Sequence, residues 1–421
     1  MKKPFKWDDN TDQAIELSDK EYISIKKKKE FLSAIKTFLA AIIILPFSLI
    51  MMPFVKRKHV DSNDFFSIGI DFTKDTKLQL ELLEELDVNR VLLRLKLWEI
   101  DNIAELEKFI LALNGKKIIL QIVQDRENIE DAELFEKNLR TIFSAFKNLI
   151  DVFEIGSSVN KVEYGFFSID EYNRFYKTAY DLKNSEFPNL NLIGSSVIDF
   201  EYHFTAHTLF NFCSYRYDGV SSQLYVDKSG APENAQMGFT LSDKIAWLST
   251  IVWLSPKSKQ DLHITQTNYS IKGTKPFSVA NEDKCVSEEI YADYMLRYYL
   301  LSFASQQVNS VSWHQLIASG YGLVDNSKTI KKRSAFSTYQ FMIKNLKNAQ
   351  FLRMDITRGY YILQCLVNNS LLQIHWSIEP TTLINEDYFE VFSRDAKPIK
   401  DEIIDIGSSP VYIYIKDKSN E

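Results

Sequence analysis

The chain has 421 residues, of which 45% are hydrophobic, so it can bury a sizeable core and is long enough for more than one domain. Its 50 basic and 56 acidic residues give a net charge of −6, a balance that does not favour nucleic acid as the main partner. The three cysteines form neither a CxxC pair nor a disulfide framework, and histidine is scarce. We therefore expect no metal site and no cofactor.

The N-terminal region combines a polar, basic segment at residues 1–36 with an uncharged stretch at residues 37–55. A helix over this stretch covers about 28 Å, close to the hydrocarbon thickness of a bilayer, so we predict a single transmembrane helix. A cleavable signal peptide is one alternative. A kinked helix that does not cross is another, because of Pro46 and Pro53. Basic residues are more numerous before the stretch than after it, which favours an inner-membrane protein with a periplasmic remainder.

Strand-like and helical patterns alternate between residues 62 and 348. The strand-like runs are Phe66–Phe72, Val91–Leu97, Lys117–Val123, Val152–Ile155, Leu190–Val197, Gly219–Tyr225, Leu262–Thr267 and Ser310–Leu316. The helical segments include Lys77–Leu86, Asp131–Lys147, Asp170–Lys183, Leu241–Leu254 and Glu288–Ser305. Eight such units predict an α/β fold of the (β/α)8 barrel type. An open, doubly wound sheet is the alternative, but no glycine-rich phosphate turn follows the first strand.

The pattern changes after residue 348. Short β-type runs separated by polar turns follow, at Tyr360–Leu366, Leu371–Trp376, Glu390–Phe392 and Val411–Ile415. We therefore predict a small β-domain at residues 349–421, appended to the barrel.

Two strand ends carry a family resemblance. The fourth strand reads Phe153-Glu154-Ile155-Gly156-Ser157-Ser158 and is followed closely by Asn160, and the seventh contains Ile264-Thr265-Gln266. These frames resemble the acid/base and nucleophile strands of clan A glycoside hydrolases, which are (β/α)8 barrels. Ser158 and Gln266 stand where that family has its two catalytic glutamates. Because ordinary hydrolysis of a glycoside needs two carboxylates, the usual retaining chemistry is not expected here.

A more specific resemblance comes from the eighth strand, with Trp313-His314, and from the loops after strands six and eight. They are similar to those of membrane-anchored, glycosidase-like proteins of lipopolysaccharide pathways. This subgroup includes the single-span subunit of the two-component hydrolase that trims the outer Kdo from Kdo2-lipid A. The resemblance implies lipopolysaccharide as ligand and a multi-span membrane protein as partner. Kdo carries a carboxylate on its anomeric carbon, which would repel an anionic nucleophile, and sialidases use Tyr on similar sugars.

Active sites of such barrels lie at the carboxyl ends of the strands, so the candidate residues are taken from there. The catalytic candidates are Tyr225, Asp125 and Glu233, because this chemistry needs a Tyr near a base and a separate acid. The candidates for binding the sugar or its carboxylate are Arg94, Arg126, Glu154, Ser158, Asn160, Lys161, Gln266, Tyr269, Trp313 and His314.

Structural roles remain as alternatives for several of these residues. Arg94 could pair with Asp71 or Glu154 inside the barrel, Tyr225 could be a packing residue, and Trp313 could belong to the core. Asp125 and Arg126 could form a simple loop pair. The second functional hypothesis is a pseudoglycosidase that binds glycan or glycolipid without cleaving it, and the third is a structural interaction module.

Overall fold

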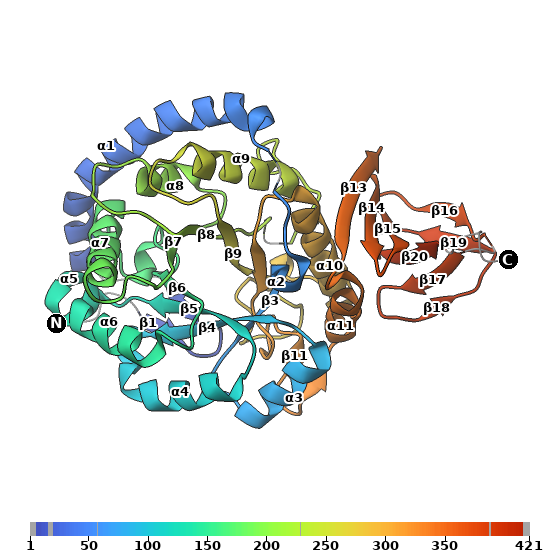
Figure 1. The fold of residues 1–421 in the computed structure, drawn as a ribbon, viewed down its shortest axis with the longest axis horizontal. Helices are drawn as coiled ribbons and strands as arrows, with labels where there is room; N and C mark the ends of the chain where they lie inside the picture. Colours follow the sequence, from blue (N-terminus) through green and yellow to red (C-terminus); the bar gives the residue numbers. More distant parts are fainter. Residues whose placement is uncertain (1–5, 16–19, 57, 228, 387–388, 416–421) are drawn as a thin grey trace.

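Eight parallel strands close into a barrel at the centre of the molecule (Figure 1). They are β3 (Phe66–Ile70), β4 (Arg90–Lys96), β5 (Lys117–Val123), β6 (Val152–Ile155), β7 (Leu192–Ile198), β8 (Gly219–Gln223), β9 (Leu262–Thr267) and β10 (Ser310–Trp313). Val311 of β10 pairs with Phe66 of β3, which closes the ring. The predicted (β/α)8 barrel is confirmed, and every strand boundary lies within three residues of its prediction.

The computed structural model describes most of the chain, namely residues 6–15, 20–56, 58–227, 229–386 and 389–415. Parts of the predicted N-terminal segment, at residues 1–5 and 16–19, lie outside the described residues. The same holds for residues 416–421 of the predicted C-terminal domain.

Helices surround the barrel (Figure 1). The longer ones are α3 (Thr76–Leu86), α4 (Ile103–Ala112), α6 (Ala132–Phe146), α7 (Ile169–Glu186), α8 (Tyr202–Leu209), α9 (Leu241–Leu254), α10 (Glu288–Ser305) and α11 (Ser334–Leu346). Short turns of helix are α2 (Ser62–Phe65), α5 (Arg126–Glu130), η1 (Met52–Phe54), η2 (Leu97–Asn102), η3 (Val162–Tyr164) and η4 (Glu282–Lys284). Local signals explain these elements: α6 buries Phe135, Leu139 and Phe146 on one face, at helical spacing. In α9, Thr240 and Asp243 form a capping box.

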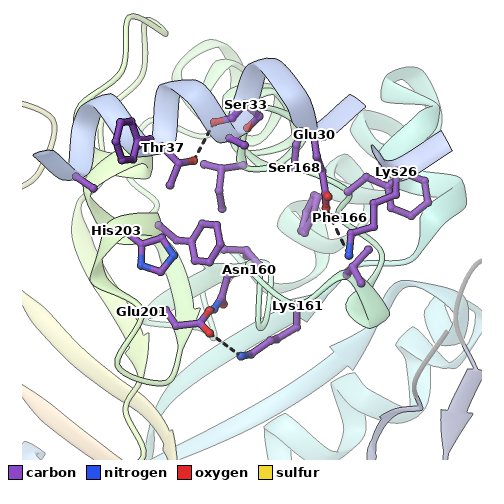
Figure 2. A pocket seen from close by; sticks show the side chains of 18 of the residues that line it. Lys26, Glu30, Ser33, Thr37, Asn160, Lys161, Phe166, Ser168, Glu201 and His203 are labelled. Atoms are coloured by element: carbon purple, nitrogen blue, oxygen red, sulfur yellow. Dashed lines mark hydrogen bonds and ion pairs between the residues drawn. The ribbon is translucent and has the colours of Figure 1, made fainter. Parts of the chain in front are cut away.

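The N-terminal helix α1 (Lys20–Met51) runs along the outside of the barrel and packs against α7, α8 and α9 (Figure 1). Its buried residues are polar: Ser33, Thr37 and Ser48 face the barrel, as Figure 2 shows for the first two. Thr37 Oγ1 lies 2.8 Å from His207 Nδ1, and Trp247 Nε1 donates to Ser48 Oγ at 2.7 Å.

The predicted apolar stretch at residues 37–55 is helical as far as Phe54, and most of it belongs to the longer helix α1, which begins at Lys20. Among the described residues, the segment Lys20–Phe54 is the one helix long and apolar enough to cross a membrane. Pro46 lies inside it.

An antiparallel β-domain follows the barrel, as predicted from the sequence (Figure 1). Its main sheet contains β13 (Gln350–Thr357), β14 (Tyr360–Val367), β15 (Ser370–Ser377), β20 (Val411–Ile415), β17 (Phe389–Ser393) and β18 (Pro398–Ile399). A two-stranded sheet joins β16 (Thr381–Ile384) and β19 (Ile403–Ile406). Contacts such as the ion pair of Arg394 with Asp293, at 2.6 Å, hold this domain against α10.

Candidate functional site

A cavity of about 470 Å3 lies at the barrel mouth, where the strands end. This volume falls within the usual range for small-molecule sites. Its polar and aromatic lining comes from the ends of β8 and β9 and from the loops that follow the strands. The lining includes Tyr164, Asp199, Glu201, Tyr225, Asp227, Gln266, Tyr269, His314 and Tyr321. After the loop that follows β10, β11 (Val324–Asp325) pairs with β12 (Lys331–Lys332) in a two-stranded sheet.

The chain's own N-terminus reaches into this mouth. Strands β1 (Lys6–Asp8) and β2 (Gln13–Ile15) form a hairpin, and the turn between them carries Thr11 and Asp12. Both residues line the cavity, and Tyr321 donates its hydroxyl to the Thr11 carbonyl at 3.0 Å. The hairpin therefore occupies part of the space that a ligand at the barrel mouth would use.

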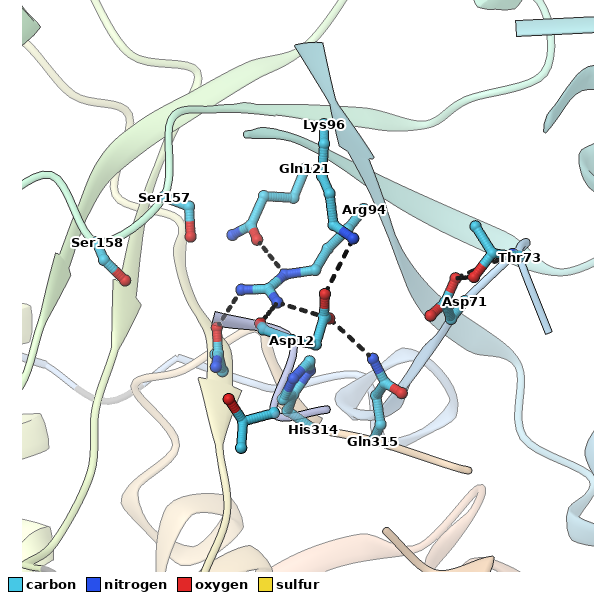
Figure 3. A network of polar contacts seen from close by, with 12 residues as sticks. Asp12, Asp71, Thr73, Arg94, Lys96, Gln121, Ser157, Ser158, His314 and Gln315 are labelled. Carbon is cyan, nitrogen blue, oxygen red and sulfur yellow. Dashed lines mark hydrogen bonds and ion pairs between the residues drawn. The ribbon is translucent and has the colours of Figure 1, made fainter. Parts of the chain in front are cut away.

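Arg94, on β4, binds the carboxylate of this turn (Figure 3). Its Nη1 donates to Asp12 Oδ2 at 3.0 Å and to the Asp12 carbonyl at 3.1 Å. Its Nε donates to Gln121 at 3.0 Å, and its Nη2 donates to Gln266 at 3.0 Å. Asp12 is thus the ion-pair partner of Arg94, in place of the two carboxylates, Asp71 and Glu154, considered from the sequence.

Two further donors reach the same carboxylate. Lys96 Nζ lies 3.1 Å from Asp12 Oδ1, and Gln315 Nε2 donates to Asp12 Oδ2 at 3.3 Å. Burial alone would raise the pKa of Asp12, but Arg94 and Lys96 outweigh it and hold the pKa well below its usual range. The turn at the mouth therefore holds the Asp12 carboxylate as an anion, against two cations that do not themselves line the cavity.

Neither of the two positions that carry glutamate in clan A enzymes carries a charge. Ser158 Oγ donates to Gln223 Oε1 at 2.6 Å, while Gln266 accepts from Arg94. Figure 3 shows Ser158 set apart from the network around Arg94. A hydroxyl and an amide cannot supply the proton transfer and the attack that ordinary glycoside hydrolysis requires.

Glu154 lies inside the barrel and is fully buried. It accepts hydrogen bonds from Gln121 at 2.7 Å and from Thr265 at 2.9 Å. Burial raises its pKa, and hydrogen bonds from neighbouring hydroxyls oppose that rise. Since Gln121 also accepts from Arg94, Glu154 orients the guanidinium through this amide instead of lining the cavity.

Of the three catalytic candidates, Tyr225 lines the mouth. Burial raises the pKa of its hydroxyl, and the nearby Arg94 and a hydrogen bond with Gln266 offset this only in part, so the phenol is protonated at neutral pH. Asp125 caps α5 by accepting from Asn128 N at 2.8 Å. Glu233 pairs with Arg297 at 3.2 Å and accepts from Trp376 Nε1 at 2.8 Å, at the junction with the C-terminal domain.

The binding candidates not yet described fall into three groups. Tyr269 and His314 line the mouth together with Gln266. Asn160 and Lys161 lie beside α1, where Lys161 pairs with Asp199 at 3.0 Å.

The remaining two candidates, Arg126 and Trp313, make buried contacts within the fold. Arg126 pairs with Glu171 at 2.7 Å and stacks over Phe167, with 4.1 Å to the ring centroid. Trp313 is fully buried and donates to Tyr291 at 2.6 Å, which places it in the core, one of the two roles considered for it.

Sequence reasoning missed Asp12, Tyr321 and the contribution of the hairpin. One signal was available, because Asp9, Asn10 and Asp12 are residue types that favour tight turns, and the pattern predicts a turn in a segment otherwise assigned only as polar. Nothing in that pattern indicates which distant residues the turn contacts. Within the described residues, no group of three His, Cys, Asp or Glu side chains is placed to hold a metal ion.

Solved glycoside hydrolases have the same fold as this chain, a parallel barrel whose strands end at an open mouth. A family 39 glycoside hydrolase from the gut symbiont Bacteroides cellulosilyticus WH2 aligns with 85% of this chain and 82% of its own, with a TM-score of 0.63 and 12% identity. A family 39 β-xylosidase from Caulobacter crescentus aligns with 86% of this chain and 98% of its own (TM-score 0.58, 12% identity).

A family 30 endoxylanase from Clostridium papyrosolvens C71 gives a TM-score of 0.56 at 8% identity, over 86% of this chain and 97% of its own. At such identities the similarity establishes the fold and not the reaction. No family model matches the chain, and no curated relative matches it by sequence.

Proposed function

We propose that this chain is a glycosidase-like protein of the inner membrane that binds the sugar acid Kdo, in the lipid A region of lipopolysaccharide, at a periplasmic barrel mouth. The observation that carries the proposal is the carboxylate of Asp12, held by Arg94 and Lys96. Arg94 and Lys96 do not themselves line the cavity, so in the proposed complex the sugar carboxylate displaces Asp12 from these two cations. Such charge-assisted contacts are among the stronger hydrogen bonds in proteins.

The neutral residues at the family's catalytic positions support the same ligand. The anomeric carbon of Kdo carries a carboxylate, which would be repelled by a glutamate at the position of Ser158 or of Gln266. Ser158 and Gln266 remove that repulsion, and Gln266 accepts a hydrogen bond from Arg94. The absence of charge at these positions therefore fits an acidic sugar better than a neutral one.

A substitution of Arg94 tests the proposed binding of Kdo. Lysine cannot reproduce the four hydrogen bonds that the guanidinium donates, so we expect Arg94→Lys to weaken the binding of free Kdo at least about tenfold, or about 1.4 kcal/mol. Isothermal titration calorimetry on the purified full chain measures this. Arg140→Lys, on the exposed face of α6, is the matched control. Unchanged Kdo affinity in Arg94→Lys, together with a lower melting temperature, would show that Arg94 has only a structural role.

Hydrolysis of the outer Kdo from Kdo2-lipid A, together with a multi-span membrane partner, is the second candidate function. Its support is Tyr225, which lines the mouth as a sialidase-type nucleophile would. In that reaction the Tyr225 oxygen bonds to the anomeric carbon, its proton passes to a base, and the bond to the leaving oxygen breaks as an acid protonates it. Water then releases Kdo from the tyrosine. Asp125 and Glu233 are engaged elsewhere, so the acid and the base would come from the carboxylates that line the mouth with Tyr225, namely Asp199, Glu201 and Asp227.

The mass of lipid A from cells decides between binding and cleavage. If the chain and its partner hydrolyse the ketoside, cells with the wild-type gene have a lipid lighter by one Kdo unit than cells with Tyr225→Phe. Equal masses, combined with Kdo binding by the purified chain, would establish a binding protein that does not cleave.

A further inference from the structure

A second cavity, of about 660 Å3, lies between α1 and the loops that follow β6 and β7 (Figure 2). Its roof is one face of α1, where Ala34, Thr37 and Ala41 recur at helical spacing. Phe166 and Phe204 contribute to its floor. Ala34 and Ala41 leave space under the roof, and aromatic side chains make part of the floor apolar. Charged residues, Lys26, Glu30 and Glu163 among them, also line the groove.

The groove reaches the barrel mouth. Asn160, Lys161 and Glu201 gather on one side of it, with Lys161 Nζ 3.1 Å from Glu201 Oε1 (Figure 2). Glu201 lines both cavities, and Asp199, which pairs with Lys161, lines the mouth. A ligand with an acidic head and an apolar tail could therefore occupy both cavities at once.

The roof helix has the reverse of the usual polarity. Its polar residues Ser33 and Thr37 face the barrel, whereas Phe31 and Ile43 on the outside are 68% and 65% exposed. A helix that faces water places its apolar side inward. The outer surface of α1 instead suits lipid hydrocarbon, so the groove beneath it opens next to the membrane from which a lipid would enter.

We propose that this groove binds an acyl chain of a glycolipid whose sugar acid lies in the barrel mouth. The proposal deepens the proposed function and rests on it for the sugar end alone. The groove is the size of a small-molecule site, and its apolar stretch lies under the one described helix suited to a bilayer. The polar side of the groove adjoins the mouth. The head group of the glycolipid would lie at that end, and its acyl chain would lie in the rest of the groove.

Filling the groove tests this inference. Ala41→Trp places a large ring under the roof, and Ala34→Trp does the same one heptad earlier, so a folding failure of one variant leaves the other. Ile43→Trp, on the outer face of α1, is the matched control. Binding of free Kdo and of Kdo2-lipid A in detergent is measured for each. We expect the two groove variants to lose at least about tenfold in affinity for Kdo2-lipid A and to keep the affinity for free Kdo, while the control keeps both.

A second probe is independent of the sugar. A fatty acid carrying a photoreactive diazirine should label the wild-type groove, at the peptide that contains Phe166, and should fail to label it in Ala41→Trp. Labelling of the groove without any Kdo binding would refute the proposed function and leave the groove assignment standing. Full binding of Kdo2-lipid A by both groove variants, or labelling confined to the outer face of α1, would overturn the assignment.

Discussion

The barrel mouth and the groove under α1 are neighbouring cavities whose lining residues differ. In the mouth, charges are matched: Arg94 and Lys96 hold the carboxylate of Asp12, and Gln121 and Gln266 complete the bonding of the guanidinium. In the groove, aromatic and small side chains line an open space that charged residues such as Lys26 and Glu163 also border. The first arrangement is the one for which we propose a sugar carboxylate, and the second is the one for which we propose an acyl chain.

The same N-terminal segment builds part of both cavities. The hairpin at residues 6–15 enters the mouth, and α1, which follows it, forms the roof of the groove. The segment that the sequence predicts to be a membrane anchor is therefore also a wall of the groove. The following variants alter one cavity and spare the other.

The largest expected effect is on the wall of the mouth. A Cβ on Gly320 would lie 1.9 Å from the carbonyl oxygen of Phe277, a backbone atom that cannot move aside cheaply. We expect Gly320→Ala to cost about 3 kcal/mol of unfolding free energy and to loosen the loop that carries Tyr321. Chemical denaturation measures the loss. Gly407→Ala, where a Cβ meets nothing within 4 Å, is the control, and a stable Gly320→Ala with intact Kdo binding would contradict the expectation.

The next effect concerns the stability of the fold at acidic pH. Burial, Arg94 and two nearby lysines, Lys74 and Lys96, keep the pKa of His314 well below its usual value, although Asp12 opposes them. A histidine with a depressed folded pKa adds stability above about pH 6.5 and loses it as pH falls, by up to about 1.4 kcal/mol per pH unit. We therefore expect His314→Gln to flatten the decline of stability below pH 6.5.

His207, beneath α1, is the comparison for that experiment. Burial lowers its pKa as well, but Asp170, 3.3 Å away, favours the protonated ring. His207→Gln should therefore change the pH dependence less than His314→Gln. Urea denaturation between pH 7.5 and 5 separates the two, and an equal slope in both variants would mean that the mouth is no more sensitive to acid than the contact of His207 with α1.

The barrel was predictable from the sequence because its strands are short apolar runs buried on both sides. The run Lys117–Val123, for example, is predicted and observed with the same bounds. The helix at residues 37–55 was predictable for a similar reason, since its composition is local information. The packing of this helix against the barrel was harder to predict. Its signal is weaker, namely the polar residues Ser33, Thr37 and Ser48, which the structure buries against the barrel.

The candidate site was predictable only in part, because its contacts join residues far apart in the chain. Arg94 was selected from its strand, but its partner Asp12 lies 82 residues earlier in the sequence. Glu233 was selected from a loop, and its partner Trp376 lies in another domain. Trp313 illustrates a further limit, since a strand pattern does not say whether an aromatic side chain faces the cavity or the core.

A smaller change concerns competition within the mouth. Because Asp12 pairs with the two cations that the sugar carboxylate would bind, we expect Asp12→Asn to raise the affinity for free Kdo about tenfold. Calorimetry on the full chain measures the change, and Asp9→Asn, exposed on the same turn, is the control. A lower affinity in Asp12→Asn would mean that this carboxylate assists the ligand instead of competing with it.

The smallest expected effect decides where α1 lies. Thr37→Val keeps the shape of the side chain but removes the hydroxyl that contacts His207, and Ser48→Ala removes the acceptor for Trp247 Nε1. Each buried partner then loses a hydrogen bond, so we expect each variant to lose about 1 kcal/mol, while Ile43→Ala on the outer face changes stability by less than about 0.5 kcal/mol. Thermal unfolding is measured both in detergent and in liposomes. If α1 stays docked on the barrel, the losses for Thr37→Val and Ser48→Ala are the same in both. If α1 leaves the barrel to cross the bilayer alone, the losses vanish in liposomes, because the two hydroxyls then contact neither His207 nor Trp247. The groove would also lose its roof in that case, so the same measurement tests whether an acyl chain can be held beneath α1 at the membrane.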